Sequence, residues 1–300
     1  MLNSKLSLFK ADSSKPELSL ALMEPNFVNQ EVLRSAIESV AVDPFLQKLS
    51  AVDQEEHRYK IPSLDCDQAK FYWIFRNVDF KQWNDLSGSQ VLWLSGPPEC
   101  SIHQTSSYIV DLAKNQLPAS QHSVLYFFCS TASGQESTIT NFVHTFLHQL
   151  VCCTPMDKKI SIIKTFLHTL LNAILKKEPL STPNQSRFLK RDSSNITIEK
   201  ILNASTEDLW NALEAVLAND QKRKLSILID GLDKVDNQNG EFIKGVRILI
   251  KHLQERISKV KALLTSRPRA EIKEVFDGLP CIEFDKERTG LVEPYLLDLN

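Results

Sequence analysis

The segment at residues 225–233, with the sequence LSILIDGLD, constrains the fold more than any other part of the chain. It is an apolar run that ends in Asp230, with Asp233 shortly after it. A short apolar run predicts a strand buried on both faces, as in a parallel sheet covered by helices. Acidic residues at the end of such a strand suit Mg²⁺ binding. The simpler alternative is a turn that uses Asp and Gly for its geometry.

Other apolar runs alternate with stretches of helical periodicity along the rest of the chain. The expected strands are 89–95, 123–129, 225–230, 260–266 and about 281–284, and the expected helices are 104–115, 137–151, 159–175, 206–217 and 242–256. Aromatic residues at helical spacing in 71–83 predict two further short helices that pack on the core. Strands separated by helices predict an α/β fold with a parallel sheet of about five strands, covered by helices on both faces.

The N-terminal part of the chain is expected to form an extension to this domain. Residues 1–60 are predicted to comprise an arm rich in Ser, Lys and Pro, followed by a short helical preface. In that preface, apolar residues recur at helical spacing, with Pro44 as an interruption. Residues 61–300 are predicted to form the main domain. Within it, the polar, proline-containing stretch 179–195 predicts an exposed, flexible loop.

The composition argues against several classes of function. The chain has 35 Lys and Arg against 37 Asp and Glu, a net charge of −2, which gives no electrostatic basis for binding nucleic acid or an anionic membrane. It has no apolar run of about 18 residues and no signal-peptide pattern, so we expect a cytoplasmic protein. The six cysteines lack C-x-x-C spacing, which predicts reduced thiols.

The expected first strand is followed by Gly96 to His103, with the sequence GPPECSIH. This is the position of G-x-x-x-x-G-K-[ST] in a P-loop nucleoside triphosphatase, where backbone N–H groups and the lysine hold the phosphates and the hydroxyl binds Mg²⁺. Here Ser101 replaces the second glycine, Ile102 the lysine and His103 the Ser/Thr. Loss of the lysine alone removes about 1.5–3 kcal/mol of binding, or roughly ten- to a hundredfold in affinity.

Polar residues are predicted to gather at the same edge of the sheet. Asp230 could hold Mg²⁺ through water, and Asp233 could orient an attacking water molecule. Lys234 follows where many such enzymes place a second acid, and we expect it to pair with one of the two aspartates. Arg267, after the next strand, could sense a γ-phosphate; a surface arginine at the end of a strand is the alternative.

The order of these motifs, WIF with F and W, then VLWLSG, LYFFC, ILIDGLDK and LLTSRP, resembles the N-terminal NTPase domain of nephrocystin-like and NACHT proteins. These belong to the STAND class of signalling P-loop ATPases, and the fungal relatives are the most similar. The resemblance covers about residues 65–290. It implies ATP or GTP with Mg²⁺ as ligand and use as an oligomerisation switch. By this resemblance, the nucleotide contacts are Gly96, Cys100, Ser101, Ile102, His103, Asp230 and Arg267, with Asp230 also the Mg²⁺ residue and Asp233 the catalytic residue.

Three functions are compatible with this pattern. The first is a degenerate STAND domain in which nucleotide binding is weak or lost, so that it has no cofactor, and which acts as a scaffold or regulatory interaction module with other proteins or further copies of itself as partners. The second is a slow Mg²⁺-dependent nucleoside triphosphatase that serves as a signalling switch. The third is a truncated product of a larger, repeat-containing protein, which would expose apolar surface near residues 291–299.

Overall fold

A computed structural model describes most of the chain. It describes residues 34–35, 37–49, 51–59, 72–85, 88–97, 100–116, 118, 121–130, 137–177, 201–219, 224–235, 240–257 and 259–284. Residues 1–33, which include the predicted N-terminal arm, the loop predicted at 179–195, and the C-terminal stretch from 285 lie outside the described residues.

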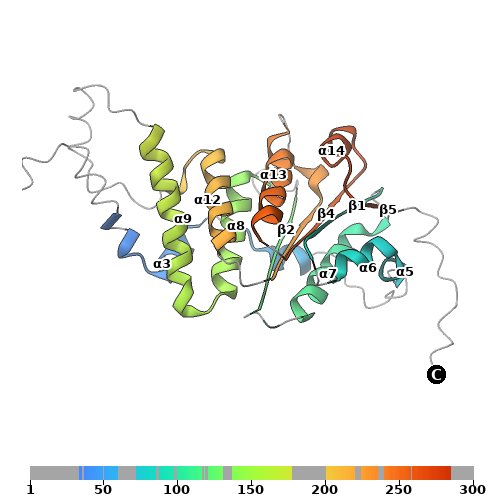
Figure 1. Cartoon of the computed structure of the whole chain (residues 1–300), viewed down its shortest axis with the longest axis horizontal. Helices are drawn as coiled ribbons and strands as arrows, with labels where there is room; N and C mark the ends of the chain where they lie inside the picture. Colours follow the sequence, from blue (N-terminus) through green and yellow to red (C-terminus); the bar gives the residue numbers. More distant parts are fainter. Residues whose placement is uncertain are drawn as a thin grey trace, which may run out of the picture.

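The described residues contain a five-stranded, all-parallel sheet with the order β2-β3-β4-β1-β5 (Figure 1). The strands are β1 (Gln90–Ser95), β2 (His122–Phe128), β3 (Lys224–Asp230), β4 (Val260–Ser266) and β5 (Cys281–Glu283). Long apolar runs form these strands because helices cover both faces of a parallel sheet. The predicted fold class, including the number and approximate positions of the strands, is confirmed.

Each face of the sheet has its own hydrophobic core, because side chains alternate along a strand. On β1, Trp93 lies in the larger core and its neighbours Leu92 and Leu94 lie in the smaller one. The smaller core is closed by α5 (Tyr72–Arg76), α6 (Val78–Asn84) and α7 (Ile102–Gln116). The larger core is closed by α3 (Val42–Lys48), α8 (Ile139–Cys153), α9 (Met156–Lys177), α12 (Thr206–Asn219), α13 (Glu241–Arg256) and α14 (Ala270–Val275).

The helices on the larger core extend past the sheet at the β2 side. α8 contacts β2, and α12 contacts both α8 and α9, so α8, α12 and α9 continue the core beyond the last strand, while α13 lies over the sheet (Figure 1). Among the described helices, including the 22-residue α9, none is both long and apolar enough to cross a bilayer.

The predicted N-terminal preface is packed into the same core as the main domain. Phe45 of α3 is fully buried in the larger core, and Ile37 and Leu49 belong to the same cluster. Pro44 does not interrupt α3, because it lies in the first turn, where its missing N–H group has no helical partner. A second short helix, α4 (Gln54–Tyr59), then lies against β2.

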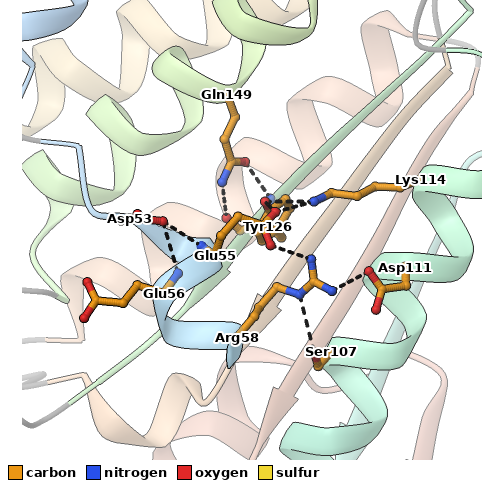
Figure 2. Close-up of polar contacts among 9 residues, drawn as sticks. All are labelled: Asp53, Glu55, Glu56, Arg58, Ser107, Asp111, Lys114, Tyr126 and Gln149. Carbon is orange, nitrogen blue, oxygen red and sulfur yellow. Dashed lines mark hydrogen bonds and ion pairs between the residues drawn. The ribbon is translucent and has the colours of Figure 1, made fainter. Parts of the chain in front are cut away.

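The outer edge of β2 is covered by glutamine side chains. Gln149 of α8 accepts a hydrogen bond from the Tyr126 backbone N–H at 2.9 Å and donates one to the Tyr126 carbonyl at 2.9 Å (Figure 2). Gln54 of α4 accepts from the Phe128 N–H at 2.6 Å. These side-chain amides replace bonds that a further strand would make, so the edge of β2 is satisfied at the Tyr126 N–H and C=O and at the Phe128 N–H.

Candidate functional site

The candidate site lies at the carboxyl ends of the strands, where parallel topology brings their last residues to one edge. β3 ends at Asp230, β4 at Ser266 and β1 at Ser95. The turn after β3 uses Gly231 in the left-handed conformation, with φ of 76°. This turn leads directly to Asp233, so both predicted acids reach the same edge.

Asp230 is the centre of the site, and both of its carboxylate oxygens are engaged. Oδ1 accepts a hydrogen bond from the Thr265 hydroxyl at 2.6 Å, and Oδ2 lies 2.5 Å from His103 Nδ1. Asp230 is only 3% exposed. Burial raises the pKa of its carboxyl, but hydrogen bonding and charge from His103, with a smaller contribution from Thr265, hold that pKa below its usual value.

The residues around Asp230 do not fit a magnesium ion. Mg²⁺ prefers oxygen ligands in octahedral geometry, and His103 supplies a nitrogen where the motif has a hydroxyl. That nitrogen is already bonded to the carboxylate oxygen that faces α7. In the described ranges, no group of three or more His, Cys, Asp or Glu side chains is arranged to hold a metal ion.

The phosphate loop keeps part of its backbone geometry. Ser101, in the place of the second glycine, has a φ of 53° and is the one described non-glycine residue with a positive φ. A side chain in the left-handed region costs about 1–2 kcal/mol. The loop therefore retains the turn that a glycine normally makes, at a cost in stability. Pro98 and Glu99 of this loop lie outside the described residues.

The residue in the lysine position is buried instead of reaching toward a phosphate. Ile102 and Cys100 belong to the smaller hydrophobic core, together with Phe284 after β5. Gly96 is required here, because a Cβ atom on it would lie 2.6 Å from Phe284 Cβ and 2.9 Å from Ile102 Cδ1. The loop is thus packed against the end of β5 by apolar contacts.

Asp233 and Arg267 bind each other. Asp233 Oδ1 accepts a hydrogen bond from the Arg267 backbone N–H at 3.0 Å, and Asp233 Oδ2 lies 3.3 Å from Arg267 Nε. Asp233 is buried, whereas the Arg267 side chain is half exposed. The predicted water-orienting acid therefore anchors the predicted sensor arginine. Their roles toward a nucleotide stay predictions.

The expected pairing of Lys234 with one of the two aspartates is wrong. In the part of the chain that the structure describes, neither carboxylate forms a hydrogen bond or ion pair with Lys234. The physical reason is competition: His103 and Thr265 occupy Asp230, and Arg267 occupies Asp233. The sequence placed Thr265 at this edge, within LLTSRP, but did not predict its partners; its hydroxyl also accepts a hydrogen bond from the Gly231 N–H at 3.0 Å. Because Thr265 lies near the end of β4, the strand that pairs with β3, its position indicated that it could contact Asp230.

Asp230 should make the stability of the protein depend on acid pH. Because its folded pKa lies below the ordinary value of 3.8, the carboxylate stabilises the fold above that value, and this contribution is lost as the pH falls through the folded pKa. We therefore expect the difference in unfolding free energy between the natural chain and Asp230→Asn to be largest at pH 7 and to shrink below about pH 5.

Urea unfolding followed by circular dichroism at several pH values measures this difference. Asp277→Asn is the matched control, since Asp277 is exposed. A difference between the natural chain and Asp230→Asn that stays constant from pH 7 to pH 3 would contradict the expectation.

The sheet order, the glycine loop between β1 and α7 and the acid at the end of β3 define a P-loop-type α/β domain. Comparison with known families agrees. The chain belongs to the family described as nephrocystin 3, N-terminal, which matches residues 70–165 and 152–267, well over half of the 300 residues. The predicted family resemblance is confirmed.

A curated relative is the vegetative incompatibility protein HET-E-1 of Podospora anserina. It is 27% identical to this chain over 115 residues, which are 38% of this chain. The match spans only 8% of the length of HET-E-1. The match therefore relates one segment of this chain to a small part of HET-E-1.

Proposed function

We propose that this chain is a regulatory P-loop-type domain that acts as a protein-interaction module and does not hydrolyse nucleotide. The observation that carries the proposal is the pairing of His103 with Oδ2 of Asp230, at 2.5 Å, while Thr265 binds Oδ1. A side chain of the loop helix thereby takes the contact that a metal-bound water would make with this acid.

The buried Ile102 supports the same proposal. A phosphate in the loop would need a cation to offset its charge, and the residue in that position is apolar and packed against Gly96. Binding would have to expose this side chain and separate a carboxylate from its imidazole partner. Both steps oppose binding, because burial of apolar surface and pairing of a buried charge favour the closed loop.

The pairing also has a structural effect that suits an interaction module. In a nucleotide-dependent switch, the link between the loop helix and the acid strand is made by a ligand and is lost with it. Here His103 and Asp230 make the link within the chain itself. The domain would then present the same surface at all times, and its partners would be other proteins or further copies of the chain.

A thermal-shift assay with ATP, ADP and GTP, each with and without Mg²⁺, tests the proposal. A ligand at about a hundred times its Kd stabilises a protein by about 2.7 kcal/mol, which corresponds to roughly 5–10 °C for a domain of this size. We expect no shift from any nucleotide and no phosphate release.

The main alternative is a slow Mg²⁺-dependent nucleoside triphosphatase, which the retained positive φ of Ser101 favours. A shift that requires Mg²⁺, together with phosphate release that is lost in Asp230→Ala, would establish the alternative and overturn the proposal.

A further inference from the structure

One face of α7 carries a line of polar side chains that connects the candidate site to the N-terminal helix α4. His103, Ser107, Asp111 and Lys114 follow one another at spacings of three or four residues, so they lie on the same side of the helix. We call these four residues the α7 polar stripe. Its first member, His103, binds Asp230, as described above.

The rest of the α7 polar stripe is bound by α4 (Figure 2). Arg58 donates hydrogen bonds to the Asp111 carboxylate and, at 3.4 Å from its Nε, to the Ser107 hydroxyl. Glu55 accepts from the Lys114 ammonium group at 2.5 Å. Arg58 also lies 2.9 Å from Glu55 Oε2, so these charges form one connected network.

The same helix is fixed to β2, next to the acid strand. Glu55 accepts a hydrogen bond from the Tyr126 hydroxyl, and that hydroxyl accepts one from Lys114 at 3.0 Å. Gln54 binds the N–H of Phe128, the residue that pairs with Asp230 in the sheet register. α4 therefore binds the C-terminal half of α7 to β2, while His103 binds the first turn of α7 to Asp230 at the end of β3.

The contacts of α4 with α7 and β2 are mainly polar. Gln54, Glu55 and Arg58 supply them; Glu55 and Asp111 are each about half exposed, whereas the Arg58 side chain between them is 11% exposed. Exposed ion pairs contribute little free energy individually, whereas a network that shares its members contributes more. An attachment of this kind can be released without opening either hydrophobic core. It also lies outside the region matched by the family, which begins at residue 70.

We propose that α4 is a strap that keeps α7, and with it His103, seated on Asp230. The position of the N-terminal region thereby controls the candidate site through the α7 polar stripe. This control goes beyond the proposed function, since it operates with or without nucleotide.

Hydrogen–deuterium exchange, measured by mass spectrometry without any ligand, tests the strap. The variant combines Glu55→Gln with Arg58→Met, which removes the two charges through which α4 binds α7 and leaves the sequences of α7 and β3 unchanged. We expect exchange of the amides in the first turn of α7, residues 102–106, to become about tenfold faster. Within this segment the Thr105 amide is protected by its hydrogen bond to the Ser101 carbonyl, at 3.0 Å, and it lies about 9 Å along the helix from Asp111.

The matched control is Glu38→Gln. Glu38 also precedes the family region and forms exposed ion pairs, but its partners are Lys164 and His168 on α9. This control should leave exchange in the first turn of α7 unchanged. If Glu55→Gln with Arg58→Met does not fold, Asp111→Asn loosens the strap more mildly, with the same expected direction. A folded strap variant with faster exchange at 107–116 but unchanged exchange at 102–106 would overturn the proposal.

Discussion

Replacing Ser101, Ile102 and His103 together with Gly, Lys and Thr should raise the affinity of the chain for Mg²⁺-ATP about a hundredfold or more. The lysine adds a charge-assisted contact to phosphate, worth about 1.5–3 kcal/mol, and each 1.4 kcal/mol is about tenfold in affinity. The threonine releases Oδ2 of Asp230 from the imidazole and supplies a hydroxyl ligand for Mg²⁺. The glycine removes the strain of a positive φ at position 101.

Isothermal titration calorimetry with Mg²⁺-ATP measures this gain, and Ser101→Gly alone is the control. That single change relaxes the loop but restores neither the cation nor the Mg²⁺ ligand, so it should leave affinity nearly unchanged. A folded triple variant that binds no better than the natural chain would show that the loop is closed for another reason. The packing of Gly96 against Phe284 would then be the first contact to change.

Phe142→Ala should lower the unfolding free energy by about 3–5 kcal/mol, because it removes a large, fully buried ring. Phe142 contacts the rings of Phe127, Phe146, Trp210 and Phe242, with centroid distances of 4.2–5.3 Å. These rings come from β2, α8, α12 and α13, so one side chain joins the sheet to three helices. A loss of this size is a large part of the roughly 5–15 kcal/mol that stabilises a typical domain.

Urea unfolding, followed by circular dichroism, gives the free energy of each variant. Phe142→Leu should cost less, since it fills more of the space, and Ile248→Ala is the surface control because Ile248 is 53% exposed. A loss below about 1 kcal/mol for Phe142→Ala would mean that the neighbouring rings close the cavity, contrary to the expectation.

The sheet could be predicted from the sequence because parallel strands buried on both faces require contiguous apolar runs, such as those of β2 and β3. It also predicted which residues reach the functional edge, since that follows from where each strand ends. The partners at that edge could not be predicted. Whether Asp230 binds Lys234 or His103 depends on side-chain directions that the spacing does not determine, and Thr265 enters only through the neighbouring strand.

The N-terminal preface shows the same limit at a larger scale. Helical periodicity identified an apolar face around residues 30–51, but periodicity does not say which surface that face covers. In the structure, Phe45 lies in the core shared with α9 and the sheet. The role of α4 was equally hidden, because its contacts with α7 join residues more than 45 positions apart along the chain.

The glutamines at the edge of β2 limit how this protein can assemble. The stretch SVLYFFC is uncharged, apolar and rich in aromatic residues, a composition that promotes fibril formation when an edge is open. Gln149 binds the backbone of Tyr126, and Gln54 binds the N–H of Phe128. These backbone groups are therefore not free to pair with a strand of another chain. At Tyr126 and Phe128, the edge of β2 is therefore closed to pairing with a strand from another copy of the domain.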